Sequence, residues 1–307
     1  MKKILILCRR DDRVEYDRKE SMLAGMAEVQ TEATYIGVDY EDLLFESDGV
    51  NLKVIDTVSG LDIADVDAAF FIGWFKTKPL EDCARAAALY LKSKNVPFLN
   101  SEIIKGRSFT KLTQCVLAVI HGVKVTPFVF CMDANKTLGW LQENPMDFPL
   151  ITKAISASRG NDNHLVHSMD ELQAVLTDTT PREKPAYFIV QDFVPNDGDL
   201  RIIVMNGRVV KVIHRQAQDG SHLNNTSKGG MATDTPVDQL PAKVIDDSIA
   251  MSKALNREIT GVDMIQHQET GEYFLLEVNN MPQLATGSLV KKKMSLLHQE
   301  LLELAGN

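Results

Sequence analysis

The chain has 307 residues, 44% of them hydrophobic, and a formal net charge of -9. This length predicts a globular protein with two or three packed subdomains, and the acidic balance argues against nucleic acid or an anionic membrane as the main partner. The opening residues, MKKILILC, contain too few apolar residues for a signal peptide or a membrane span and predict a first strand instead.

The cysteine and histidine pattern argues against a zinc site. Four cysteines lie far apart without a C-x-x-C pair: Cys8, Cys83, Cys115 and Cys131. This spacing indicates reduced thiols in a cytoplasmic protein. His164 and His167 are three residues apart, but no cysteine or third histidine is near them, so we expect exposed loop histidines.

The first hundred residues alternate strand and helix patterns. The runs KILILC, DAAFFIGWF and VPFLN predict strands, and KESMLAGMAEV and LEDCARAAALYLKSKN predict amphipathic helices. This alternation is typical of a small α/β layer with a mostly parallel sheet. No G-x-G-x-x-G follows the first strand and no G-x-x-x-x-G-K-[ST] occurs, which argues against a dinucleotide site or a P-loop.

The next segment carries a candidate phosphate-binding lysine. SFTKLTQCVLAVIHG predicts a helix that ends at Gly122, and VTPFVF and FPLITKA predict strands. Lys153 lies near the end of the second strand, before a polar loop whose backbone amides could surround phosphate oxygens. The alternative is a surface lysine on a strand edge. SMDELQAVL then predicts a helix with a capping box of Ser168 and Glu171.

Two arginines mark the following hairpin. In DLRIIVMNGRVVKVIHRQ, Asn206-Gly207 between two apolar runs is a strong hairpin pattern. Arg201 lies on a strand that is otherwise apolar on both faces, where a guanidinium needs an anion. Arg215 ends the returning strand and could meet the same anion. A helix is predicted in PAKVIDDSIAMSKALN.

The last predicted hairpin joins GVDMIQ to YFLLEVNN through a turn in HQETGEY. Strict alternation places Glu277 and Asn279 on one strand face, with Tyr273 and Leu275. It assigns the opposite, core face to Phe274, Leu276 and Val278.

In one register of this hairpin, Asp263 faces Glu277 and His267 faces Tyr273. Asp263, Glu277 and Asn279 then form an oxygen ligand set suited to a hard cation such as Mg²⁺. A register shifted by one residue would separate them, and a solvated strand face is the simpler alternative.

Lys153, QDFV, DLR, NNTSKGG, GVDM and EVNNMP occur in this order along the chain. Their order and spacing resemble the ATP-grasp superfamily, and most closely the RimK-like ribosomal-protein glutamate ligases. The resemblance implies an α/β and α+β protein with the ATP-grasp fold, in which two α+β subdomains clamp ATP after a small Rossmann-like pre-ATP-grasp layer. We therefore expect the pre-ATP-grasp α/β domain at 1–100, ATP-grasp subdomain A at 101–190 and subdomain B with the metal site at 191–307.

The same resemblance implies roles for individual residues. The implied nucleotide contacts are Lys111 and Lys153 at the phosphates, Asp192 and Phe193 at the adenine, Asp199 near the ribose, and Asn224 and Asn225 by the triphosphate and its metal. Asp263, Glu277 and Asn279 would bind two Mg²⁺ ions, with Glu277 as the bridge and Mn²⁺ as a substitute. Arg201 and Arg215 would be the catalytic arginines that steady the transferred phosphoryl group. The chain departs from the family pattern at Asn163, at Leu223 and at Gln283, which replaces a glycine.

The activity implied is that of an ATP-dependent carboxylate-amine ligase, forming an amide or peptide bond through an acyl phosphate and releasing ADP. Its partners would be ATP, a carboxylate substrate and an amine acceptor, which is an amino acid, a peptide or a protein tail, with neither nucleic acid nor membrane. Homo-oligomerisation stays open. The alternatives are a non-catalytic ATP-binding regulatory or scaffold protein on the same fold, and a protein without a nucleotide.

Overall fold

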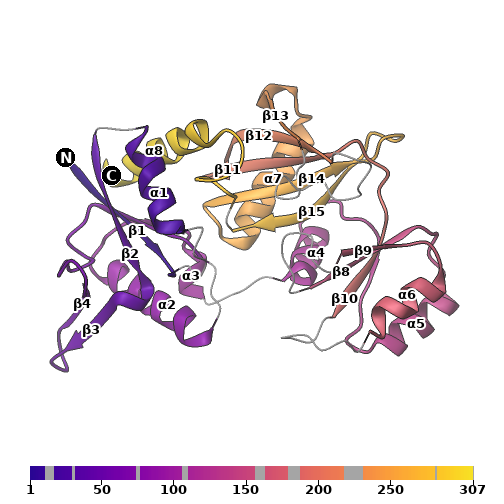
Figure 1. Cartoon of the computed structure of the whole chain (residues 1–307), viewed down its shortest axis with the longest axis horizontal. Coiled ribbons are helices and arrows are strands. Elements are labelled where there is room, and N and C mark those ends of the chain that lie inside the picture. Colours follow the sequence, from indigo (N-terminus) through magenta and orange to yellow (C-terminus); the bar gives the residue numbers. More distant parts are fainter. Residues whose placement is uncertain are drawn as a thin grey trace.

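A computed structural model describes residues 1–10, 17–29, 32–73, 77–105, 110–155, 163–178, 187–217, 231–280 and 282–306. Three sheets follow one another along the long axis of the molecule (Figure 1). Their order along the chain agrees with the predicted α/β layer followed by two α+β parts. The predicted boundaries at residues 100 and 190 stay predictions.

The N-terminal sheet is parallel and has the strand order β2-β1-β5-β6. Its strands are β1 (Lys2–Cys8), β2 (Ala33–Asp39), β5 (Ala68–Phe71) and β6 (Phe98–Leu99). Its helices are α1 (Arg18–Ala27), α2 (Lys78–Ser93), the short α3 (Glu102–Lys105) and the C-terminal α8 (Val290–Gly306). Helices α1 and α8 pack on one face and α2 on the other, because the strands are apolar on both faces.

A two-stranded ribbon, β3 (Leu43–Ser47) and β4 (Leu52–Asp56), follows a 3-10 turn, η1 (Tyr40–Asp42), and extends from the N-terminal layer (Figure 1).

The second sheet is antiparallel, with the order β7-β10-β8-β9. It contains β7 (Phe128–Val129), β8 (Leu150–Ala154), β9 (Asn163–Val166) and β10 (Phe188–Asp192), with helices α5 (Ala134–Glu143) and α6 (Met169–Leu176). Ser168 caps α6 as predicted, accepting a hydrogen bond from the backbone N–H of Glu171. His167 is exposed as expected, but the prediction of a loop position for His164 is wrong: it lies in β9 with its ring against Phe188, at 6.0 Å between centroids.

The third sheet has the order β13-β12-β11-β14-β15 and is antiparallel throughout. It contains β11 (Asp199–Met205), β12 (Arg208–Gln216), β13 (Met231–Thr235), β14 (Ile259–Gln266) and β15 (Tyr273–Asn279). Helices α4 (Lys111–Ile120) and α7 (Ala242–Leu255) pack against this sheet. A short 3-10 turn, η3 (Val237–Gln239), precedes α7. The predicted hairpin turn is confirmed: Asn206 and Gly207 have φ of +46° and +74°, the two left-handed residues of a type I′ turn.

A β-bulge interrupts the last hairpin. Asp263 faces Glu277 as predicted, but Met264 faces Leu275, so Leu276 is an extra residue. The prediction that His267 faces Tyr273 is wrong, because the bulge shifts the register and Gln266 occupies that place. The predicted core face is wrong for the same reason: Leu275 joins Val278 in the core, and Phe274 and Leu276 do not.

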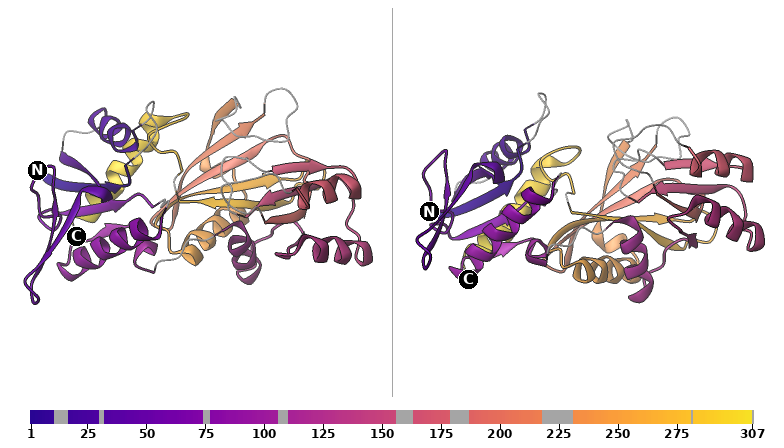
Figure 2. Two further views of the ribbon diagram at one scale, coloured as in Figure 1. Left: turned by 60° about the horizontal axis from the view of Figure 1, so that its bottom comes forward. Right: turned by 90° about the horizontal axis from the view of Figure 1, so that it is seen from below.

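Helix α8 returns to the N-terminal layer after the third sheet (Figure 2). Its Glu300 accepts a hydrogen bond from the side chain of Asn206 at 2.7 Å, which ties the helix to the turn between β11 and β12. The helix therefore contacts two of the three parts of the molecule. No helix in the described ranges combines the length and apolar character needed to cross a bilayer, and the four cysteines are free.

Candidate active site

Three adjacent strands of the third sheet place charged residues directly opposite one another. Arg201 on β11 faces Asp263 on β14, and Asp263 faces Glu277 on β15. Two residues before Arg201, on the same face of β11, Asp199 faces Arg215 on β12. The sheet register therefore brings together charged residues that lie up to 78 positions apart in the sequence.

Four of these groups form a buried ionic network. Arg201 binds Asp263 through Nε and through Nη2, the latter at 2.9 Å from Oδ2. Arg215 reaches the same Oδ2 at 3.0 Å and donates from Nε to Oδ1 of Asp199 at 2.6 Å. All four residues are at most 7% exposed. The anion that the sequence required for Arg201 is thus Asp263, and Arg215 meets it too.

The two buried carboxylates differ in pKa. Burial would raise the pKa of Asp263, but Arg201 and Arg215 outweigh it and hold that pKa below its usual range. Burial raises the pKa of Asp199 to about 6, against the opposing effect of Arg215 and with a further rise from Asp263. Asp263 therefore keeps its negative charge at neutral pH, as a metal ligand must.

The predicted metal ligands converge. The Asn279 side-chain amide donates to Asp263 Oδ2 at 3.1 Å and to Glu277 Oε1 at 2.9 Å, so a donor group stands between the two carboxylates. A Mg²⁺ ion fits this set of hard oxygen ligands, once the amide turns its oxygen inward. Among the described residues, no three His, Cys, Asp or Glu side chains cluster closely enough to hold a metal alone. The remaining ligands would have to be phosphate oxygens and water.

Two lysines lie on the side of Glu277. Lys111 begins α4, and its Nζ is 3.8 Å from Glu277 Oε2. Lys153 on β8 is only 9% exposed, which excludes a surface lysine. Burial lowers the pKa of Lys153, and Lys111 lowers it further, whereas Cys115 and Glu277 oppose the shift. The second sheet thus places a desolvated ammonium near Glu277 of the third.

Helix α4 is fixed to β15 by Gln114. The Gln114 side chain accepts from the backbone N–H of Val278 at 2.7 Å and donates to its carbonyl at 3.1 Å. Because β15 is the edge strand of its sheet, these bonds satisfy backbone groups that would otherwise lack a strand partner. Gln114 therefore fixes the position of α4, which carries Lys111, relative to β15, which carries Glu277.

The remaining predicted nucleotide contacts lie elsewhere. Asp192 and Phe193 are half-buried at the passage from the second to the third sheet, and their backbone N–H groups donate to Pro127 and Pro149 carbonyls at 3.2 and 3.4 Å. Burial and the nearby Asp147 raise the pKa of Asp192. Asn224 and Asn225 lie outside the described residues. The structure thus brings the predicted metal ligands together with Lys111, and it places Asp192 at the end of β10, in the sheet that carries Lys153.

Sequence reasoning missed two residues that shape the site. Gly261 lies beside Arg201, where a Cβ would stand 2.8 Å from Arg201 Cδ and 2.9 Å from Pro282 Cβ. In the sequence, only the glycine of GVDM indicated this close contact.

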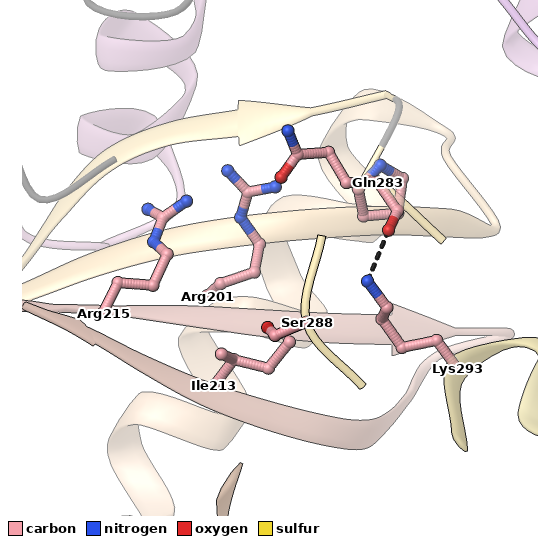
Figure 3. Close-up of a pocket in the computed structure, with 7 residues that line it drawn as sticks. Arg201, Ile213, Arg215, Gln283, Ser288 and Lys293 are labelled. Carbon is pink, nitrogen blue, oxygen red and sulfur yellow. Dashed lines mark hydrogen bonds between the residues drawn. The ribbon is translucent and has the colours of Figure 1, made fainter. Parts of the chain in front are cut away.

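Lys293 is the second of these residues. It lines a small pocket together with Arg201, Ile213, Arg215, Pro282, Gln283 and Ser288 (Figure 3). Nothing in the run VKKKM distinguishes it from the lysines beside it.

Solved structures of similar fold include three ligases. The ATP-grasp ligase PsnB, solved with minimal precursor, Mg and ADP, has a TM-score of 0.68 and 13% identity over 99% of this chain and 98% of its own. The VanG D-Ala:D-Ser ligase of Enterococcus faecalis has a TM-score of 0.68 and 16% identity over 99% and 100%. A RiPP-associated ATP-grasp ligase of Chryseobacterium gregarium, in complex with ADP and a leader and core peptide, has a TM-score of 0.67 and 13% identity over 99% and 97%. These likenesses show that the fold is that of ATP-grasp ligases over the whole chain.

Sequence comparison identifies the family. A "Probable alpha-L-glutamate ligase" of Cellvibrio japonicus is 27% identical over 189 residues, 60% of this chain and 59% of that protein. One of Xanthomonas campestris is 34% identical over 138 residues, 43% of this chain and 39% of that protein. The first of these matches therefore spans less than two thirds of the relative's length. The model of the RimK-like ATP-grasp domain matches residues 109–300, which is more than half of the chain, and the chain therefore belongs to the RimK-like ATP-grasp family.

Proposed function

We propose that the protein is an ADP-forming ligase that joins a carboxylate to an amine through an acyl phosphate. The observation that carries this proposal is the row of Arg201, Asp263 and Glu277 across three strands, with Asn279 between the carboxylates. A solvated strand face does not explain it, because Arg201 and Asp263 are buried. Burying an ion pair adds little stability on average, so the arrangement favours a functional role.

The reaction has two balanced steps. A carboxylate oxygen of the substrate attacks the γ-phosphorus of ATP, and ADP leaves. The amine nitrogen then attacks the acyl carbon, inorganic phosphate leaves, and the nitrogen loses a proton as the amide forms. No covalent bond to the protein is needed, so the side chains act by positioning and charge neutralisation.

The described residues suit these steps. Lys111 and Lys153 would bind the phosphates, since each carries an ammonium beside the carboxylate end of the site. Arg201 and Arg215 hold Asp263 in place, and we assign them to the transferred phosphoryl group as well. Asp263, Glu277 and Asn279 would hold Mg²⁺, two ions with Glu277 as the bridge and Mn²⁺ as a substitute, which would neutralise phosphate charge.

The nucleotide base is assigned to the passage between the second and third sheets. Asp192 and Phe193 would flank the adenine, with Asp199 toward the ribose and Asn224 and Asn225 toward the triphosphate. This assignment is supported by the order of these segments along a chain of this family, and by the place of Asp192 at the end of β10, in the sheet that carries Lys153 and shortly before β11, which carries Arg201. Domains at 1–100, 101–190 and 191–307 would then enclose the nucleotide.

The substrate class is proposed from the relatives. The curated relatives are named probable alpha-L-glutamate ligases, and two structurally similar ligases were solved with peptides, PsnB with a precursor peptide and the Chryseobacterium gregarium ligase with a leader and core peptide. We therefore expect the acceptor to be an amino acid, a peptide or a protein tail. No observation favours one of these three.

A coupled ADP-release screen tests the proposal. Amino acids, short peptides and acidic protein tails would be offered in pairs with Mg-ATP, with mass spectrometry of the products. We expect ADP release that depends on both substrates, and a product whose mass is the sum of the two minus one water. Nucleotide binding without acceptor-dependent ADP release would instead support a regulatory or scaffold protein.

A further inference from the structure

A small pocket beside the ionic network is rich in hydrogen-bond donors. Figure 3 shows Arg201 and Arg215 side by side, the side chain of Gln283 turned toward Arg201, and Lys293 approaching from the opposite side. Ser288 adds a hydroxyl, and Ile213 and Pro282 complete the lining. No acidic side chain lines the pocket among the described residues, although Asp263 and Asp199 lie behind the arginines.

Lys293 is the unusual member of this pocket. It lies in the first turn of α8 and is only 2% exposed. Its Nζ donates to the backbone carbonyls of Gln283 at 2.5 Å and Thr286 at 2.7 Å. An ammonium has three N–H donors, so one remains. The neighbouring Lys292 differs: it is exposed and pairs with Asp234 at 2.7 Å.

The charges of the pocket do not cancel. Arg201 and Arg215 are matched by Asp263 and Asp199, whereas the Lys293 ammonium meets two neutral backbone carbonyls and forms no ion pair with an acidic side chain in the described part of the chain. Burial and the adjacent Arg201 lower the pKa of Lys293 to about 8. A buried ammonium without a counterion is costly, and an oxyanion in the pocket would remove that cost.

The backbone at Gln283 also points to a built site. Gln283 has a φ of +55°, a left-handed conformation that glycine adopts without strain and other residues adopt at a cost. The family pattern described above has glycine at this position. Here a glutamine is kept in the strained conformation, with its side-chain amide in the pocket and its carbonyl on Lys293. Strain of this kind is concentrated at functional sites.

We propose that Lys293 is a specificity-determining residue that binds an oxyanionic group of the substrate beside Arg201. The inference rests on the proposed ligase function and narrows its substrate class to molecules with an oxyanion that enters this pocket, next to Ser288 and Gln283. The oxyanion is either a carboxylate carried by the substrate or the phosphoryl group transferred to it. Since α8 packs against the N-terminal sheet, the substrate would bind between that layer and the third sheet.

Binding measurements on matched variants test the proposal. Lys293→Met removes the charge at nearly constant shape, and Lys292→Met is the control with the same change at an exposed neighbour. Calorimetric titration would use L-glutamate and inorganic phosphate as separate probes, each with Mg-ADP present. We expect Lys293→Met to weaken at least one probe tenfold or more, and Lys292→Met to change neither by more than twofold. Loss for L-glutamate assigns a carboxylate, and loss for phosphate assigns the phosphoryl group.

A second variant decides the question if Lys293→Met does not fold. Ser288 is only half-buried, so Ser288→Asp would be tolerated and would place a competing carboxylate in the pocket. It should weaken the same probe. Unchanged binding of both probes by the folded variants, or failure of the wild-type protein to bind either probe, would overturn the proposal.

These outcomes are separable from failure of the ligase proposal. Probe binding needs no turnover, so wild-type protein that binds a probe but releases no acceptor-dependent ADP would refute the ligase and retain the pocket. If the wild-type protein ligates and Lys293→Met has the same KM for the same substrates, the ligase stands and the role of Lys293 is refuted.

Discussion

The central strands of the first and third sheets, β1 and β11, are both largely buried but with different side chains. In β1, Ile4, Leu5, Ile6 and Leu7 are all 0% exposed and fill both faces with apolar groups. In β11, Arg201 is 7% exposed, and it faces Asp263, which is 2% exposed. The first sheet is stabilised by apolar surface removed from water. The third sheet instead has ionised side chains at positions that are just as buried.

The difference appears even along one strand. Arg201, Ile203 and Met205 alternate onto a single face of β11, yet Ile203 and Met205 belong to the apolar cluster that includes α8, and Arg201 belongs to the ionic network. The chemistry of the face changes within two residues. Because buried ion pairs are often no more stabilising than apolar replacements, we attribute this change to the proposed function rather than to stability.

The largest expected effect comes from breaking the network at that point. Arg201→Met should destabilise the fold by about 3 to 5 kcal/mol, because it leaves Asp263 buried with one partner fewer. Ile203→Ala, on the same face, should cost about 2 to 5 kcal/mol by opening a cavity. Chemical denaturation measures both. Only the arginine variant should also lose acceptor-dependent ADP release under native conditions. Equal losses of activity in the two variants would contradict the separate roles assigned to Arg201 and Ile203.

Glu277→Gln on β15 should lower turnover without a comparable loss of stability. The change keeps the size of the side chain and removes the charge proposed to hold the metal. Turnover should fall by about two orders of magnitude or more, since one lost electrostatic contact at a transition state costs about 3 to 4 kcal/mol. Stability should change by only about 0.5 kcal/mol.

The control for this change is Glu272→Gln, just before the same strand, where Glu272 is exposed and pairs with Lys124. It should leave turnover unchanged, and Asn279→Ala should reduce turnover less than Glu277→Gln does. ADP release is to be measured at saturating Mg²⁺, after circular dichroism shows that each variant is folded. Near wild-type turnover of folded Glu277→Gln would refute the metal-strand assignment.

A smaller effect concerns a buried charge outside the network. Burial raises the pKa of Glu102 on α3 to about 7, and Arg257, 3.8 Å away, offsets this only in part. The folded state therefore binds a proton more tightly than the unfolded chain, and stability should fall as pH rises through about 4.5 to 7. Glu102→Gln removes this contribution.

Denaturation of both proteins at pH 5 and pH 8 measures it. The free energy of unfolding of the wild-type protein, relative to that of the variant, should drop by about 1 to 3 kcal/mol between these pH values. A parallel pH dependence would mean that Glu102 is ionised in the fold. Mg-ATP binding should be the same in both, because Glu102 belongs to α3, next to the first sheet, and not to β14 or β15, which carry the proposed metal ligands.

The same two regions show how far the sequence could predict the structure. The parallel N-terminal layer follows from apolar runs alternating with amphipathic helices, and the pairing of Asp263 with Glu277 follows from hairpin geometry. The bulge at Leu276 did not follow, because it depends on whether Leu275 or Leu276 fits the core that α4 and α7 form. Lys293 did not follow either, since the helix packing decides which lysine of VKKKM is buried.

The central claim is that Asp263, Glu277 and Asn279 form a Mg-ATP site, and thermal unfolding of the wild-type protein with nucleotide tests it most directly. A ligand at 100 times its Kd stabilises the fold by about 3 kcal/mol. We predict that Mg-ATP raises Tm and that ATP with EDTA loses most of this increase, because the phosphates reach the carboxylates only through the metal. An increase in Tm that is the same with EDTA as with Mg²⁺ would contradict the account.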